Sequence, residues 1–245
     1  MGDEFPREDA FDEDYLYFYE ELLTPERTAA DVELVWRLLE LSPGLELLDL
    51  ACGHGRIANA LAERGVRVTG LDATPLFLDL ARADAAERGL DVEYVEGDMR
   101  SIPWRERFDR VLCWFTSFGY FSDEENRAVL AGACGALKPG GLFAVELNHR
   151  DNLLGRYADE TVSERGEDRM VDRHRLDLRT GRSFDRRTVV RGGKSRSFEF
   201  SVRMFSAAEL RDWLLAAGFR EAEPYGQDGE PLRLEHRRMT LVARK

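Results

Sequence analysis

The sequence predicts an α/β fold: a Rossmann-like, doubly wound, mostly parallel seven-stranded sheet with an antiparallel hairpin insertion. Short apolar runs alternate with amphipathic helical stretches, a pattern typical of strand–helix–strand units in a parallel sheet. A glycine-rich turn follows the first apolar run, and an arginine-rich segment with hairpin signals interrupts the alternation later in the chain. These observations together set the fold class.

Helix-start signals separate the predicted strands. Thr24-Pro25 and Thr74-Pro75 each combine an N-cap residue with a proline in the first turn. Ser122 with Glu125, and Ser206 with Glu209, have the spacing of a capping box. We expect parallel strands over 45–51, 66–71, 92–95, 108–114 and 142–147, and two closing strands near 219–223 and 238–243.

The arginine-rich segment has its own composition. Between Arg150 and Arg203 there are thirteen arginines and one lysine against ten carboxylates, whereas the whole chain has a formal net charge of -12. Apolar-polar alternation over 169–178, 183–191 and 197–204, with glycines between, predicts hairpins. The predicted organisation is an N-terminal aromatic lid (1–23), a core (24–149 and 206–245) and an antiparallel β insertion that serves as a cap or in homodimerisation (150–205).

The composition disfavours several classes of protein. No run approaches the ~18 apolar residues of a membrane span, and the acidic start lacks the regions of a signal peptide, so we expect a cytoplasmic protein with no membrane partner. The net charge of -12 and the pI near 5.0 would repel a phosphate backbone, which disfavours nucleic acid. The three cysteines lack metal-ligand spacing, and we expect no metal.

The residues that carry chemistry begin at the turn Asp49-Leu-Ala-Cys-Gly-His-Gly-Arg56. Its glycines let the backbone approach a ligand, and Asp72, after the second strand, can accept both hydroxyls of a ribose. A cofactor with a nucleoside is therefore indicated. The spacing of Gly53, Gly55 and Ala58 also fits a relaxed dinucleotide fingerprint, so a nicotinamide-dependent oxidoreductase stays an alternative.

The sign of the charge at Asp49 favours a different cofactor. A carboxylate at the end of the first strand would repel a pyrophosphate, but it attracts the ammonium and sulfonium of S-adenosylmethionine. After the third strand, Asp98 can accept the adenine amino group and Met99 can cover the ring. Carboxylates at three successive strand ends thus agree on S-adenosylmethionine.

These motifs, together with Lys138-Pro-Gly-Gly141, resemble those of class I S-adenosylmethionine-dependent methyltransferases over about 24–148. The resemblance implies that 238–243 is a final antiparallel strand, that the glycine turn holds the amino-acid part of the cofactor, and that Asp72 binds ribose and Asp98 adenine. The predicted cofactor-binding residues are Asp49, Ala51, Gly53, Gly55, Arg56, Asp72, Ala73, Asp98, Met99 and Phe115.

A looser resemblance concerns the acceptor. The stretch 115–120 and the insertion are similar to small-molecule methyltransferases, including aminosugar N-methyltransferases. This implies in-line methyl transfer to nitrogen or oxygen of a small molecule. An RNA methyltransferase is a variant supported only by the basic insertion, and a noncatalytic protein with a vestigial pocket is a third option, disfavoured by the intact acids.

Two residues are candidates on the acceptor side. His149 follows the fifth strand, where ligands bind in such sheets, and an imidazole can act as a base near neutral pH; capping the strand is its structural alternative. Tyr19 lies at helical spacing from Tyr15, with Phe18 beside it. This aromatic group is expected either to cover the cofactor or to fasten the N-terminal segment onto the core.

Overall fold

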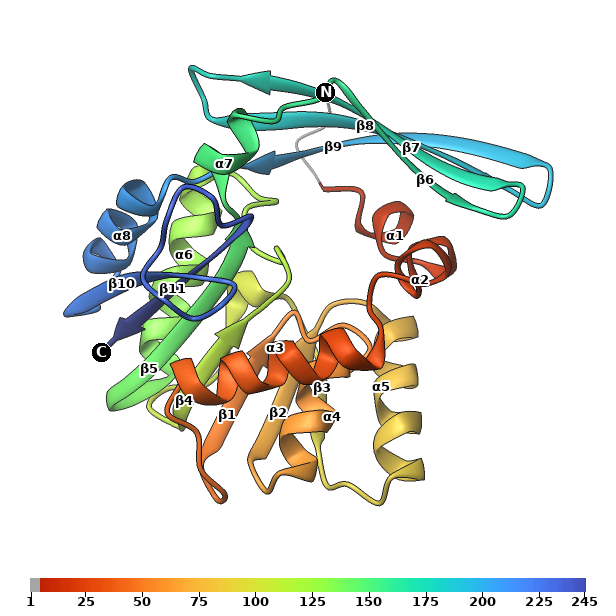
Figure 1. Ribbon diagram of the computed structural model, residues 1–245. Helices are drawn as coiled ribbons and strands as arrows, with labels where there is room; N and C mark the ends of the chain where they lie inside the picture. Colours follow the sequence, from red (N-terminus) through yellow and green to blue (C-terminus); the bar gives the residue numbers. More distant parts are fainter. Residues whose placement is uncertain (1–4) are drawn as a thin grey trace.

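The computed structural model describes residues 5–245. Its larger sheet consists of β1 (Glu46–Leu50), β2 (Arg67–Asp72), β3 (Glu93–Glu96), β4 (Phe108–Cys113), β5 (Leu137–Asn148), β10 (Glu221–Gly226) and β11 (Arg238–Arg244). The strand order is β10-β11-β5-β4-β1-β2-β3 (Figure 1). Strands β1 to β5 pair in parallel and β11 runs antiparallel to β5, which confirms the predicted fold class.

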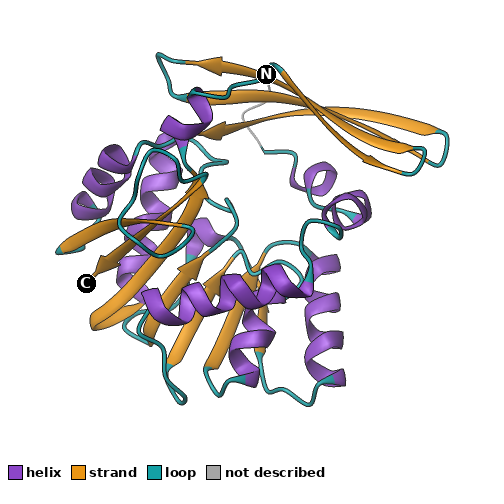
Figure 2. Cartoon of the chain, viewed as in Figure 1, coloured by secondary structure: helices purple, strands orange, loops and turns teal. Residues whose placement is uncertain are grey.

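Helices cover both faces of this sheet (Figure 2). Leu47 and Leu48 are neighbours in β1, yet Leu47 packs with α3 and α4 while Leu48 packs with α6 and α8. Strands buried on both faces in this way are typical of doubly wound folds. The helices are α3 (Pro25–Leu38), α4 (Arg56–Glu63), α5 (Pro75–Glu87), α6 (Asp123–Ala136) and α8 (Ala207–Ala216), with the short 3-10 turn η1 (Met99–Ser101) after β3.

Strand β5 is longer than predicted. The strand was predicted over 142–147, but Lys138-Pro-Gly-Gly141 also belongs to β5. The register with β4 shifts between the pairs Phe108↔Leu137 and Arg110↔Leu142, and Gly140 has φ +78. A bulge therefore absorbs the turn-forming residues within the strand, and their amino-acid types alone do not show this.

The insertion forms a separate four-stranded antiparallel sheet, the cap. Its strands are β6 (Glu160–Arg165), β7 (Asp168–Asp177), β8 (Arg182–Arg191) and β9 (Lys194–Arg203), in that order, and helix α7 (Arg150–Leu154) precedes them. The hairpins were predicted, but β6 and α7 were missed. Almost all of β6 is exposed, so it lacks the apolar alternation by which strands are recognised.

The second predicted capping box is only half formed. The Ser206 hydroxyl accepts the Glu209 N–H at 3.2 Å, as the spacing predicts. The Glu209 carboxylate instead pairs with Arg203 of the cap. By contrast, both halves of the box are present at Ser122 and Glu125. A long-range ion pair thus takes the place of the local hydrogen bond at the start of α8.

The N-terminal segment contacts both the core and the cap, with Phe11 and Tyr15 against Phe77 of α5. Its helices α1 (Arg7–Ala10) and α2 (Glu13–Tyr19) lie beneath β6 to β9 in Figure 1. Arg196 of β9 donates to both Asp12 and Asp14, and Arg191 of β8 donates to Asp14 at 2.9 Å. We call these contacts the lid clamp. Much of the arginine excess noted in the sequence therefore pairs with the acidic lid.

Two further features concern the described residues as a whole. None of their helices combines the length and the apolar character needed to cross a membrane. Within 5–245 there is also no cluster of three or more histidine, cysteine or acidic side chains arranged to hold a metal ion.

Candidate cofactor and acceptor site

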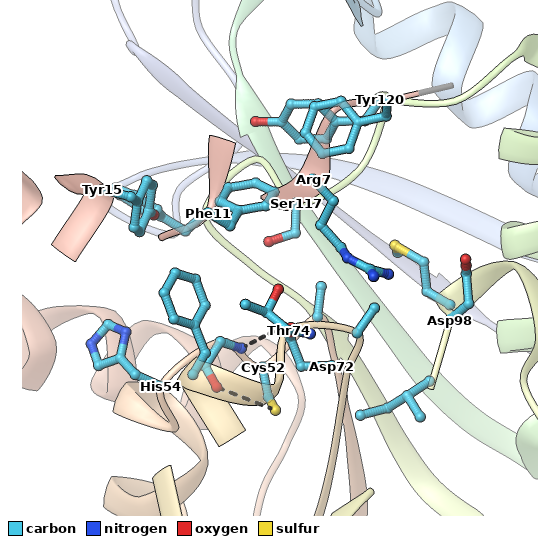
Figure 3. Close-up of a pocket in the computed structure, with 18 of the residues that line it drawn as sticks. Arg7, Phe11, Tyr15, Cys52, His54, Asp72, Thr74, Asp98, Ser117 and Tyr120 are labelled. Carbon is cyan, nitrogen blue, oxygen red and sulfur yellow. Dashed lines mark hydrogen bonds between the residues drawn. The ribbon is translucent and has the colours of Figure 1, made fainter. Parts of the chain in front are cut away.

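A cavity of about 530 Å³ opens at the carboxyl ends of the parallel strands, where the lid roofs it. Figure 3 shows Phe11, Tyr15 and Tyr120 across the cavity from Asp72. Nine of the ten predicted cofactor residues line it: Asp49, Ala51, Gly53, Arg56, Asp72, Ala73, Asp98, Met99 and Phe115. The structure therefore brings these nine predicted residues together around one cavity.

Gly55 is the tenth predicted residue, and it does not line the cavity. It precedes α4 with φ +79, a conformation that favours glycine. A Cβ at this position would collide with the Tyr94 Oη and lie 2.9 Å from the Ala81 Cβ. The structure thus assigns Gly55 to close packing at the start of the helix, not to contact with a ligand.

Asp72 fixes the glycine turn to the end of β2. Its Oδ2 accepts the Gly53 N–H at 2.8 Å, and its Oδ1 accepts the Thr74 N–H at 2.8 Å. Burial raises the pKa of this carboxyl, while the backbone hydrogen bonds act to lower it. Because a carboxylate oxygen has two acceptor positions, each oxygen can still accept a hydrogen bond from the cavity.

Asp49 is the least satisfied acid of the site. Its side chain is only 3% exposed, and no hydrogen bond to its carboxylate is found within 5–245. Burial raises its pKa to about 7, and the negative charge of Asp72 acts in the same direction. A buried carboxylate without a partner, facing a cavity, is suited to a cationic ligand.

Asp98 is held by a residue that sequence reasoning missed. Arg100 donates from Nε to both carboxylate oxygens, at 3.1 and 3.0 Å, and from Nη2 at 2.7 Å. Burial acts to raise the pKa of Asp98, but the bonds from Arg100 outweigh it and the pKa is lowered. Asp98 is therefore ionised and oriented at the cavity edge, and the two-residue spacing to Arg100 was the available signal.

Arg56 lines the cavity, but its charge is directed elsewhere. Its Nη2 lies 2.8 Å from the Asp31 carboxylate, and its Nη1 donates to the Thr28 hydroxyl at 3.2 Å. The guanidinium stacks at 5.8 Å from the Phe115 ring. Arg56 thus joins α4 to α3 and supports Phe115, and it does not offer a free charge to the cofactor.

His149 lies outside the cavity. It is 3% exposed, its Nδ1 is 2.8 Å from the His236 carbonyl, and its backbone N–H donates to the Arg237 carbonyl. It therefore ties the end of β5 to the loop before β11, which is the structural alternative considered for it. The geometry gives no support to a role as a base.

Tyr19 does not line the cavity either. Its ring stacks on Tyr15 at 4.2 Å, and its hydroxyl lies 3.4 Å from Nη2 of Arg187 in the cap. Tyr15 lines the cavity in its place, while Phe18 packs on Met170 and Val189 of the cap. Of the aromatic group, Tyr15 therefore lines the cavity, while Phe18 fastens the segment to the cap and not to the core as expected.

The roof and walls contain aromatic residues that the sequence did not single out as site residues. They are Phe5, Phe11, Phe77, Tyr120 and Phe121. Phe5 and Tyr120 have their ring centroids 4.6 Å apart, and Phe11 lies 5.8 Å from Tyr120. These rings cover part of the space above the glycine turn and would shield that part of a ligand from water.

Comparison with known proteins identifies this arrangement. Residues 47–141 match a family profile described as a methyltransferase domain. The cypemycin N-terminal methyltransferase from a Streptomyces species is 31% identical over 204 residues, which cover 81% of this chain and 82% of that protein.

Solved structures agree on the fold. The CcbJ methyltransferase from Streptomyces caelestis superposes with a TM-score of 0.79 at 24% identity, covering 99% of this chain and 96% of that one. The sugar N-methyltransferase KedS8 from a Streptoalloteichus species gives 0.68 at 25% identity, covering 100% and 98%. The alternatives of a nicotinamide-dependent oxidoreductase and an RNA methyltransferase are not favoured. The chain therefore belongs to the class I S-adenosylmethionine-dependent methyltransferases, with S-adenosylmethionine as its cofactor.

Proposed function

We propose that this enzyme transfers the methyl group of S-adenosylmethionine to a nitrogen or oxygen atom of a small-molecule acceptor, and we favour nitrogen. The observation that carries the proposal is the cavity itself, with an aromatic roof and a buried acid on its floor that accepts no hydrogen bond from residues 5–245. The names of two relatives support nitrogen, since one is an N-terminal methyltransferase and the other a sugar N-methyltransferase.

The proposed placement of the cofactor follows the acids on the floor. Asp49 and the turn at Gly53 would hold its amino-acid part, Asp72 its ribose, and Asp98 with Met99 its adenine. The charges fit, because Asp49 is buried and accepts no hydrogen bond from the described part of the chain, while Asp98 is ionised beside Arg100. When bound, the cofactor supplies an activated methyl group on a positively charged sulfur.

The chain's main contribution to methyl transfer would be positioning. Holding two reactants in line can account for ~7–11 kcal/mol of barrier reduction when the geometry is good. Phe11, Tyr15 and Tyr120 would exclude water and confine the acceptor. Burial raises the pKa of both phenols, so they stay protonated and do not serve as bases. An acceptor that enters as a neutral amine needs no base, because its lone pair is already free.

The first experiment is a calorimetric titration with S-adenosylhomocysteine, with NAD titrated separately. Binding of the first ligand alone would support the proposed site, and binding of NAD alone would overturn it. Small amines and phenols are then incubated with S-adenosylmethionine, and mass spectrometry follows the gain of one methylene unit in the product. Methylated amines without methylated phenols would support nitrogen over oxygen.

We also propose a cytoplasmic location and a cap that holds the lid over the site, with homodimerisation as its second use. The three cysteines are free thiols, as is usual in a reducing compartment. The edge strand β6 exposes Val162 to 49%, which offers a place for a second chain to pair. Light scattering during gel filtration tests the dimer.

A further inference from the structure

Two consecutive residues after β4 have a backbone conformation that their side chains disfavour. Phe115 and Thr116 both have φ +59, in the left-handed region. Neither is glycine, and Thr116 is β-branched, so both residues are strained in this conformation. Strain of this kind persists only where surrounding groups enforce it.

Glu146 of β5 provides the enforcing contacts. Its carboxylate accepts the Phe115 N–H at 2.9 Å, and its backbone carbonyl accepts the Thr116 N–H at 3.0 Å. One residue therefore binds the N–H groups of both strained positions. The turn is completed by the Ser117 hydroxyl, which donates to the Trp114 carbonyl at 2.8 Å.

Glu146 is itself fixed in place. It is 4% exposed, and Arg238 of β11 donates to both of its carboxylate oxygens. Arg238 is oriented in turn by the Asn148 side chain at 2.7 Å. Burying an ion pair adds little stability compared with apolar packing of the same shape. The pair is better explained by the geometry that it imposes on its neighbours.

That geometry shapes the cavity wall. Phe115, Ser117 and Tyr120 all line the cavity, and Figure 3 shows Ser117 and Tyr120 above the floor. Thr116 does not line it, and its buried hydroxyl has no hydrogen-bond partner within 5–245. Thr116 thus has both a strained backbone and an unsatisfied hydroxyl, while its neighbours Phe115 and Ser117 line the cavity.

We propose that Glu146 is a positioning residue for methyl transfer. It holds Phe115 and Thr116 in the left-handed conformation and so fixes the position of the cavity wall formed by Phe115, Ser117 and Tyr120 beside the cofactor. This inference rests on the proposed placement of the cofactor in this cavity. Once Glu146 no longer enforces the turn, only part of the population has the binding-competent wall, and the apparent affinity falls by that fraction.

The test compares Glu146→Gln with Glu146→Gln/Thr116→Gly, using calorimetry with S-adenosylhomocysteine and thermal melts. A glutamine side chain is neutral and has one acceptor oxygen, so its NH2 group must face either Arg238 Nε or the Phe115 N–H together with Arg238 Nη2. At least one of these donors then loses its acceptor, and we expect about tenfold weaker binding in the single variant. Glycine adopts φ +59 without strain, so the double variant should recover to within about threefold of the parent. If the ion pair only stabilised the fold, the glycine would not restore binding.

Two controls separate the outcomes. Glu221→Gln breaks an exposed ion pair with Arg244 on the neighbouring pair of strands and should leave affinity unchanged. Thr116→Gly alone should not lower the melting temperature, because it removes both the strain and the unpartnered hydroxyl. Unchanged affinity in Glu146→Gln, no recovery in the double variant, or a clear loss of stability in Thr116→Gly would overturn the inference. Failure of the parent protein to bind S-adenosylhomocysteine would instead count against the proposed function.

Discussion

Binding of S-adenosylhomocysteine should release a proton from Asp49. In the free protein, burial raises the pKa of this carboxyl to about 7, with Asp72 acting in the same direction. A ligand ammonium placed beside Asp49 would favour the ionised carboxylate. The free protein must therefore lose a proton before or during binding at any pH below about 7, and affinity should fall as the solution becomes more acidic.

The size of the effect follows from the pKa. With a value of about 7, Asp49 is about nine-tenths ionised at pH 8 and about one-tenth ionised at pH 6. Because apparent affinity scales with the competent fraction, S-adenosylhomocysteine should bind roughly tenfold, or about 1.4 kcal/mol, more weakly at pH 6 than at pH 8.

Calorimetry in buffers of different ionisation enthalpy measures both the affinity and the protons released. Binding should release nearly one proton per ligand at pH 6 and only a small fraction of a proton at pH 8. Asp49→Asn is the control, since its amide is neutral and should remove the steeper part of the pH dependence. An affinity that stays constant from pH 6 to 8, or an unaltered slope in Asp49→Asn, would refute the reasoning.

The same pKa has a consequence for stability. A carboxyl whose pKa is higher in the folded state binds more protons there than in the unfolded chain. Stability attributable to Asp49 should therefore decline as pH rises from the ordinary pKa of 3.8 through about 7. Asp49→Asn should accordingly melt at a higher temperature than the parent at pH 8 without ligand, while binding more weakly. Differential scanning calorimetry of both proteins at pH 6 and pH 8 checks this.

Three further perturbations address other parts of the site. Asp72→Ala removes the acceptor of the Gly53 and Thr74 N–H groups and of the proposed ribose contact. Each charge-assisted hydrogen bond contributes ~1.5–3 kcal/mol, so calorimetry should show at least about tenfold weaker binding of S-adenosylhomocysteine. Normal affinity would contradict the assignment. Arg196→Glu reverses the charge of the lid clamp, and stopped-flow fluorescence should then show several-fold faster release of S-adenosylhomocysteine. High salt should speed release from the parent protein in the same way. An unchanged rate would mean that the lid need not open. Gly55→Ala places a Cβ against the Tyr94 Oη at φ +79, and a denaturant melt should show a loss of ~1–3 kcal/mol; parental stability would argue against the packing role.

The floor of the site was predictable because its signals are local. Glycines at a turn, an acid after each strand and the proline at the start of a helix are encoded within a few residues of one another. Asp49, Asp72 and Asp98 were therefore located before the structure was known, and all three line the cavity.

The roof could not be predicted in the same detail, because its contacts join distant parts of the chain. Which of Tyr15, Phe18 and Tyr19 faces the cavity depends on how α2 lies against the cap, and helical spacing alone does not determine this. The position of His149 depends on the loop before β11, nearly ninety residues later. Strand β6 was missed because polar, exposed side chains give no periodic signal.

The division between floor and roof bears on how such an enzyme acquires new acceptors. The matched methyltransferase profile spans 47–141, which contains the glycine turn and all three acids but neither the lid nor the cap. The lid clamp joins those two outer segments across about 180 positions of sequence. Exchanging only one of them between relatives would leave unmatched charges, whereas exchanging both together would keep the clamp intact and change only the part of the cavity lining that the lid supplies. The pair is therefore the natural unit for building chimeric enzymes with altered specificity.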